Sequence, residues 1–197
     1  MDKSERTRNL IIEISAPIFN MKGYEGTSLS DITVKTGFTK GAIYGHFENK
    51  DDLAIAALEY NLKNVSTLMF ENVLSYDHSC DRLKAFSMAY AANYDVMVKN
   101  GGCPVLNAAV DSDDGNPRIK KRVDDFIKMW RRTIVKIVND GISKNEILPG
   151  TDAESFASIF IALTEGGFMA SKTTGKRIYI DHAVDHIIAM INAFRRD

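Results

Sequence analysis

Cysteine is scarce in this sequence, with only Cys80 and Cys103 among 197 residues. Two thiols are too few for a disulfide framework, so we expect both to be reduced. No apolar run is long enough to cross a bilayer, which excludes a membrane-spanning helix. The N-terminal stretch MDKSERTRN is charged and lacks the apolar segment of a secretory signal. These absences predict a cytoplasmic protein without a membrane partner.

The sequence also has little net charge, with a formal value of −1 at neutral pH. The first 50 residues carry one more basic than acidic residue, which is a small excess. Bulk charge therefore gives no support to a polyanionic partner. Binding to nucleic acid has to be argued from the positions of individual residues.

Signatures of common enzymes are missing. The sequence contains no Gly-x-Ser-x-Gly, no His-Glu-x-x-His, no phosphate-binding P-loop and no dinucleotide-binding glycine pattern. His182 and His186 share a helix face and could bind a metal with Asp181 and Asp185, but this histidine spacing arises easily by chance. We expect a protein that is not an enzyme and that has no metal site and no cofactor.

Helical periodicity is abundant, because apolar residues recur three and four positions apart along almost the whole chain. Strand signals are nearly absent. We predict an all-α fold of about nine helices, divided into an N-terminal helix-turn-helix domain at residues 1–48 and a helical domain at residues 49–197.

The N-terminal domain begins with a helix predicted at residues 4–22. Pro17 lies inside this helix and predicts a local kink, and Gly23 marks its end. The predicted buried face contains Leu10, Ile11, Ile14, Ile18 and Phe19.

Two short helices follow this first helix. Ser28 and Asp31 form a predicted capping box, and Gly37 supplies a left-handed residue that ends the helix. Thr39 caps a second helix at residues 40–47. Two short helices joined by a tight turn form a helix-turn-helix.

Capping and turn residues place the remaining helices. Asn49 caps one helix, Asn116 precedes a proline that opens another, and Thr151 forms a predicted capping box with Glu154. The predicted helices after the helix-turn-helix lie at residues 50–75, 81–99, 104–110, 117–143, 153–171 and 179–195.

The second short helix has a buried and an exposed face. Ile43 and Phe47 lie four residues apart and bury together. The residues left pointing outward are Lys40, Gly41, Tyr44 and Gly45. A helix that enters the major groove needs base-reaching side chains without bulk that holds its backbone away. The exposed face meets this requirement.

The stretch GYEGTSLSDITVKTGFTKGAIYGHFENKDDL resembles the DNA-binding region of the tetracycline-repressor (TetR) family of bacterial transcriptional regulators. The resemblance covers residues 5–55. It rests on the Gly-x-x-x-Thr entry, the Gly-Phe-x-x-Gly turn, the Tyr-x-His-Phe segment and the following Asn-Lys. Pro17 departs from the plain helix former that many relatives carry. By this resemblance, the DNA contacts are Thr27, Ser28, Thr39, Lys40, Gly41, Ala42, Tyr44, His46 and Lys50.

The resemblance implies a homodimer that binds double-stranded operator DNA, with reading helices about 34 Å apart for half-sites one turn apart. It also implies that the helical domain at residues 49–197 binds an effector and mediates dimerisation. A small apolar or aromatic effector would then release the repressor through the helix beginning at Asn49. A helix-turn-helix that contacts only proteins is the alternative. A salt titration separates the two, because phosphate contacts make affinity fall steeply with salt.

Small residues at four-residue intervals mark a predicted dimer interface on the helix at residues 153–171, which would join the last helix in a four-helix contact. An internal core face is the alternative interpretation. The interface candidates are Ser158, Ala162, Gly166, Ile187, Ile191 and Phe194.

Aromatic residues and methionine are dense on the middle helices and suit an apolar ligand pocket, although core packing uses the same residues. Cys103 follows a helix end and precedes a helix start, so a thiol-based redox or electrophile sensor is an alternative function. The pocket candidates are Phe70, Phe86, Tyr90, Tyr94, Met97, Cys103, Phe126, Trp130 and Phe168.

Overall fold

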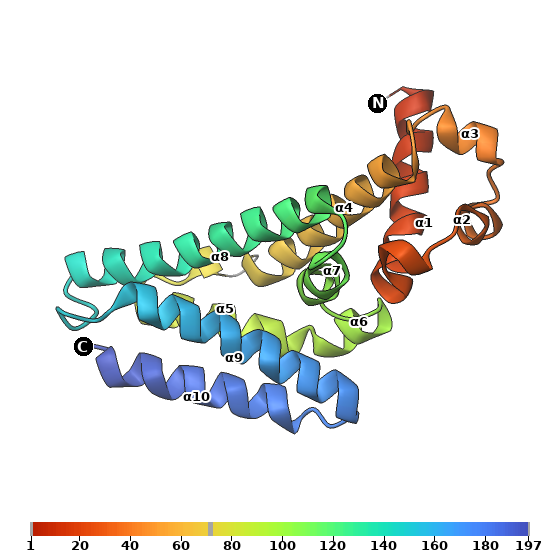
Figure 1. Cartoon of the computed structure of the whole chain (residues 1–197). Coiled ribbons are helices and arrows are strands. Elements are labelled where there is room, and N and C mark those ends of the chain that lie inside the picture. The colour runs from red at the N-terminus through yellow and green to blue at the C-terminus, as the bar shows by residue number, and fades with distance from the viewer. Residues whose placement is uncertain (1, 71–72, 197) are drawn as a thin grey trace. The chain divides into compact units, whose positions relative to one another are not determined.

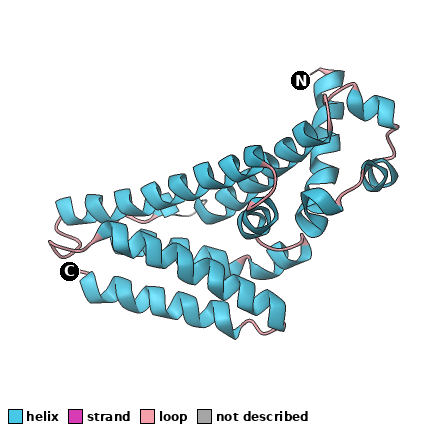
Figure 2. Cartoon of the chain, viewed as in Figure 1, coloured by secondary structure: helices cyan, strands magenta, loops and turns pink. Residues whose placement is uncertain are grey.

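A computed structural model describes residues 2–70 and 73–196, and in these ranges it consists of helices and connecting loops (Figures 1 and 2). The predicted all-α fold is confirmed. A short 3₁₀ helix lies at Val73–Ser75. The α-helices are α1 (Lys3–Gly26), α2 (Leu29–Thr36), α3 (Lys40–Tyr44), α4 (Lys50–Phe70), α5 (Ser79–Ala92), α6 (Tyr94–Lys99), α7 (Pro104–Ser112), α8 (Pro117–Ser143), α9 (Ala153–Thr174) and α10 (Ile178–Phe194).

The chain forms two compact units that do not follow the order of the sequence. Residues 1–65 and 99–124 form the first, and residues 66–98 and 125–197 form the second. The first unit includes α7 because this helix packs on α1. The boundary expected after residue 48 stays a prediction about independent folding domains.

The core of the first unit lies between α1, α2, α3 and α4. Side chains from these helices and from the loop after α3 bury against one another, and this burial holds the helix-turn-helix on α1. The buried cluster contains Ile11, Ile12, Ala16, Phe19, Ile32, Ile43, Phe47, Leu53, Ala54 and Ala57. Leu10 was predicted to be buried but is 45% exposed, and Ile12 is buried instead.

The helix α1 breaks at Gly23 and not at Pro17. Gly23 has φ of 75° and ψ of 171°, and it is the residue inside α1 with non-helical backbone. The helix is therefore not broken at Pro17, and the local kink expected there stays a prediction. Ala16 and Ile18 on either side of the proline are buried in the core, and this packing keeps the backbone helical despite the lost hydrogen bond.

The short helices α2 and α3 begin as predicted. The Ser28 hydroxyl accepts from the Asp31 amide and the Asp31 carboxylate accepts from the Ser28 amide, which confirms the capping box. Gly37 has the expected left-handed conformation, and the Thr39 hydroxyl caps α3 by accepting from Ala42. However, α3 ends at Tyr44, three residues before the predicted position.

The helix start at Asn49 is also as predicted, since its side-chain oxygen accepts from the Asp52 amide over 2.9 Å. Two later predictions are wrong. The helix predicted at residues 81–99 is divided at Asn93, whose side-chain amide donates to the Ala89 carbonyl and competes with the helical backbone. The helix α9 is capped by Asp152, while the Thr151 hydroxyl donates to the Leu148 carbonyl.

The second unit contains the antiparallel pair α9 and α10, drawn side by side in blue in Figure 1. The two helices approach closely at Gly167. A Cβ atom at this position would lie 2.9 Å from the Ala183 Cβ and 3.1 Å from the Ile180 Cα. Glycine is therefore needed here for packing within the protomer.

Candidate nucleic-acid interface

The helix α3 presents the face expected of a reading helix. Ile43 is 1% exposed and anchors the helix in the core, while the next residue, Tyr44, is 47% exposed. Lys40, Gly41 and Ala42 are exposed with it. The face therefore combines one cation, one aromatic ring and very small side chains.

The two glycines beside this face differ in what surrounds them. A Cβ at Gly41 would meet only the Thr39 hydroxyl at 4.0 Å, so the protein interior does not require glycine here. A Cβ at Gly45 would lie 3.3 Å from the Ala42 carbonyl oxygen, so Gly45 serves the turn itself.

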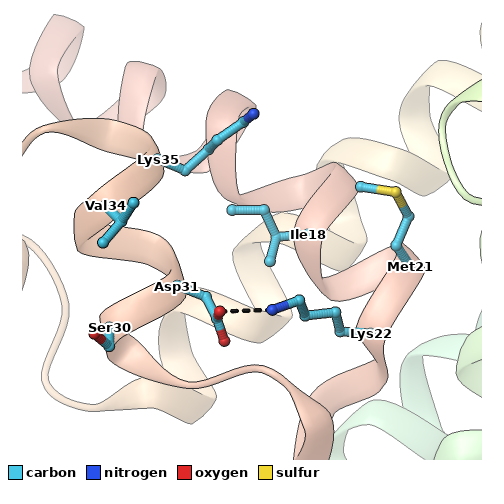
Figure 3. A pocket seen from close by; sticks show the side chains of 7 residues that line it. All are labelled: Ile18, Met21, Lys22, Ser30, Asp31, Val34 and Lys35. Atoms are coloured by element: carbon cyan, nitrogen blue, oxygen red, sulfur yellow. Dashed lines mark hydrogen bonds and ion pairs between the residues drawn. The ribbon is translucent and has the colours of Figure 1, made fainter.

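The start of α2 carries a carboxylate that is already neutralised. Lys22 forms an ion pair with Asp31 over 2.5 Å, from α1 to α2 (Figure 3). This bond and the hydrogen bonds from Ser28 lower the pKa of Asp31 from 3.8 to about 2. Ser28 is exposed next to this pair.

A cavity of about 360 Å³ lies between α1 and α2, and the Lys22–Asp31 ion pair crosses it (Figure 3). Its apolar side chains are partly exposed, since Val34 is 82% and Met21 58% accessible to solvent. The lining residues are Ile18, Met21, Lys22, Ser30, Asp31, Val34 and Lys35.

Thr27 was expected to contact DNA, but its side chain is fully buried. The hydroxyl donates to the Gly23 carbonyl over 2.7 Å and thereby closes the broken end of α1. A role for Thr27 at the DNA rests on the family resemblance, and its side chain is used inside the protein.

Lys50 is also engaged inside the first unit. Its ammonium donates to the carbonyl of Tyr24 over 2.9 Å and to that of Thr27 over 3.1 Å. It lies 4.3 Å from the centre of the Tyr24 ring. These contacts join the first turn of α4 to the end of α1 and occupy two of the three N–H donors expected to meet phosphate.

Two further side chains flank the reading helix. His46 is half-buried just after α3, and its ring remains partly accessible. Arg8 of α1 places its guanidinium 4.9 Å from the centre of the Phe47 ring, beside the same loop. Sequence analysis missed Arg8, because one arginine on a long charged helix is not a distinctive signal.

The aromatic pocket candidates gather in the second unit. Successive ring centres lie 4.8–6.5 Å apart from Phe70 through Phe86 and Trp130 to Phe126. Tyr90 stacks on Trp130, and Phe168 contacts both Tyr90 and Tyr94. Most of these rings are buried, as is Met97. They form one aromatic cluster, as both the pocket and the core interpretations require.

Polar groups are built into this aromatic cluster. The Tyr90 hydroxyl donates to the Glu165 carboxylate over 2.8 Å. Trp130 is 1% exposed, and among the described residues its indole N–H finds no hydrogen-bond acceptor. A buried donor without an acceptor costs about 1–3 kcal/mol, so this N–H is a costly feature of the cluster.

Cys103 differs from the other pocket candidates because it belongs to the first unit. Its side chain is fully buried at the N-cap of α7, where the sulfur accepts from the Leu106 amide at 3.5 Å. The thiol therefore acts as a capping group.

The dimer candidates fall into two groups. Ser158, Ala162 and Gly166 are exposed along α9, and a Cβ at Gly166 would meet no atom within 4 Å. Ile187 and Ile191 are fully buried within the protomer. Their assignment to an interface is corrected, because they face the core. Phe194 is half-buried and packs edge-on against Phe156 at 5.1 Å.

The histidines of α10 lie on its exposed side, and the neighbouring Asp181 accepts from Arg177. Across residues 2–70 and 73–196, no three His, Cys, Asp or Glu side chains gather in a way that could hold a metal ion. No helix in these ranges is both long and apolar enough to span a bilayer.

Two family models match the chain. The model described as "Bacterial regulatory proteins, tetR family" matches residues 11–57. The model described as "Tetracyclin repressor-like, C-terminal domain" matches residues 79–187. The likeness thus extends well beyond the N-terminal region in which the sequence motifs lie.

Solved structures agree with this match. A TetR transcriptional regulator from Chloroflexus aurantiacus is 37% identical, with 100% of this chain and 99% of that chain covered and a TM-score of 0.95. A TetR-family regulator from Cytophaga hutchinsonii is 36% identical, with 100% and 98% covered and a TM-score of 0.92. An uncharacterised helix-turn-helix-type transcriptional regulator of Bacillus subtilis is 25% identical over 169 residues, 85% of each chain. The chain therefore belongs to the tetracycline-repressor family of transcriptional regulators, whose members are DNA-binding proteins and not enzymes.

Proposed function

We propose that this regulator is a repressor that reads its operator with α3 and leaves it when a small apolar or aromatic effector binds. The exposed face of α3 carries the proposal. Its small residues allow the backbone to approach the major groove, Lys40 donates to a guanine or a phosphate, and Tyr44 contacts a phosphate or a thymine methyl group.

The proposed contacts divide by the placement of their side chains. The exposed or half-buried residues Ser28, Thr39, Lys40, Gly41, Ala42, Tyr44 and His46 meet DNA directly. Thr27 and Lys50 act from within the protein, by holding the end of α1 next to Ser28. Arg8 is an added candidate for a phosphate contact.

Binding to the DNA that flanks the protein's own gene tests the proposal. Tyr44→Ala is compared with Tyr76→Ala, since Tyr76 has nearly the same exposure, 45% against 47%, and lies outside the helix-turn-helix. We expect wild type and Tyr76→Ala to bind with steep salt dependence and Tyr44→Ala to bind at least about tenfold more weakly. If neither that DNA nor any sequence selected from random DNA is bound, the proposal fails.

We further propose a homodimer formed through the outer faces of α9 and α10. The exposed apolar residues Ile159 and Met169 extend the surface of Ala162 and Gly166 on α9, and Tyr179 continues it on α10. Exposed apolar side chains gathered on a helix pair are typical of an association surface. The dimer would place two reading helices about 34 Å apart, for half-sites one helical turn apart.

The effector site is proposed within the aromatic cluster around Trp130. The cluster supplies apolar area, the indole N–H supplies a donor, and the Glu165 carboxylate beside Tyr90 supplies an acceptor. Trp130 is the one tryptophan of the sequence, so its fluorescence reports directly on this region. An effector found by release of operator DNA should also change this emission. An unchanged emission would place the effector elsewhere.

A further inference from the structure

Tyr24 is held from two sides at the end of α1. Its backbone amide donates to the Asp111 carboxylate of α7 over 2.6 Å. Its hydroxyl donates to Asp51 of α4, and the same carboxylate accepts from the Asn116 side chain over 3.0 Å. The last turn of α1 is therefore fastened both to α4 and to the segment that contains α7.

The Asp111 carboxylate also occupies the space next to Gly23. A Cβ at Gly23 would lie 2.7 Å from one carboxylate oxygen and 3.2 Å from the carboxyl carbon. The left-handed backbone at Gly23 interrupts α1 and leaves the following amide without a helical acceptor. Asp111 supplies that acceptor, so the break and the carboxylate fit each other.

The break decides where α2 begins. The Gly23 carbonyl accepts from the Thr27 hydroxyl over 2.7 Å, and Ser28 follows as the N-cap of α2. A change in backbone angles at Gly23 therefore moves Ser28 and the start of the helix-turn-helix. Asp111 reaches this point from more than 80 residues away in the sequence.

We propose that Asp111 is a positioning residue for operator binding, which holds the break at Gly23 and so sets the position of the helix-turn-helix. This inference rests on the proposed function. Through Asp111, α7 would support the helix-turn-helix, and a movement of α7 would change operator affinity directly.

Other contacts keep α7 in place when Asp111 is changed. The Asn107 side chain donates to the Asn20 carbonyl over 3.0 Å, and the Asn20 side chain donates to the Gly102 carbonyl over 3.0 Å. The variant Asp111→Ala should therefore fold, with α7 still docked on α1.

The experiment measures operator affinity by fluorescence anisotropy for wild type, Asp111→Ala, Asp111→Asn and the control Asp114→Ala. Asp114 is exposed on the loop after α7, so its loss removes the same charge without touching α1. Removal of a negative charge by itself strengthens binding to DNA. We expect Asp111→Ala instead to bind about tenfold more weakly, because the Tyr24 amide loses a charged acceptor. Asp111→Asn should fall between Asp111→Ala and wild type, since its amide oxygen still accepts.

A double-mutant cycle with Gly23→Ala tests the geometry. Gly23→Ala should weaken operator binding in the wild-type background and cost less in the Asp111→Ala background, where the clash is gone. If Asp111→Ala does not fold, the operator affinities of Asp111→Asn and Gly23→Ala test the inference. The inference is overturned if wild type and Asp111→Ala bind the operator equally well. This holds even if Asp111→Ala unfolds at a lower midpoint than wild type, because its role would then be in stability alone. Failure of wild type to bind any DNA overturns the proposed function instead.

Discussion

The ammonium of Lys50 donates to the backbone carbonyl of Tyr24 over 2.9 Å and lies 4.3 Å from the centre of the same residue's ring. Carbonyls at the end of a helix lack helical partners, and a cation is favoured there by the helix dipole. Lys50 therefore stabilises the junction of α1 and α4. This role explains why a lysine occupies the first turn of α4, and no bound phosphate is needed for the explanation.

Replacement of Lys50 and of Lys40 should have different effects. We expect Lys50→Gln to lower the free energy of unfolding by about 2 kcal/mol and to leave the salt dependence of operator binding unchanged. Lys40→Gln should leave stability unchanged and reduce the slope of log affinity against log salt by about 1. Urea unfolding and salt titrations measure both. A reduced salt slope for Lys50→Gln would show that this lysine meets phosphate after all.

The acid stability of the first unit should depend on Asp31. Its pKa is about 2 in the folded protein, against an ordinary value of 3.8, chiefly because Lys22 donates to it. Between pH 3.8 and pH 2 the unfolded chain binds more protons than the folded protein. The stabilisation by Asp31 is therefore present above pH 3.8 and is lost as the pH falls to about 2. We expect Asp31→Asn to show a flatter decline of the melting temperature between pH 5 and pH 2. If the melting temperatures of wild type and Asp31→Asn decline in parallel, Asp31 is not the source of the acid sensitivity.

The adjacent glycines of α9 should respond differently to substitution. Gly167→Ala places a Cβ 3.1 Å from the Tyr179 carbonyl oxygen and the Ile180 Cα, and should destabilise the protomer by about 1–3 kcal/mol. Gly166→Leu meets open space in the protomer, so it should keep the fold and weaken the dimer. Thermal unfolding and analytical ultracentrifugation separate the two effects. A fully dimeric Gly166→Leu protein would place the interface elsewhere.

Both thiols should be unreactive in the folded protein. Burial raises the pKa of Cys80 to about 11, and Cys103 is fully buried at its helix cap. We expect negligible labelling by a charged disulfide reagent until denaturant is added, and oxidants should release operator DNA equally from wild type and Cys103→Ser. Release that disappears in Cys103→Ser would favour the thiol-sensor alternative.

Local sequence was sufficient for the helix-turn-helix. The capping box of Ser28 and Asp31, the left-handed Gly37 and the caps at Thr39 and Asn49 are confirmed, because each acts between residues at most four positions apart. Where two local signals competed, the prediction was wrong. The cap of α9 is Asp152 and not its neighbour Thr151, since either oxygen could reach the first turn.

Periodicity also determined which face of α3 is exposed, because Ile43 and Phe47 can bury in only one direction. It could not distinguish an interface from a core on α9 and α10. Ile187 faces the interior while Ala162 faces solvent, and both fit the same helical spacing. The neighbouring helices decide this, and their positions are not encoded in one helix.

The sequence by itself determined the helical class, the helix-turn-helix and the exposed face of α3, since hydrophobic spacing and capping are short-range effects. Only the tertiary structure decided the use of Lys50 and Asp111. Each of the two completes the hydrogen bonds of backbone at the broken end of α1. Backbone groups are present in every residue and carry no sequence signal, so their distant partners become visible only when the chain is folded.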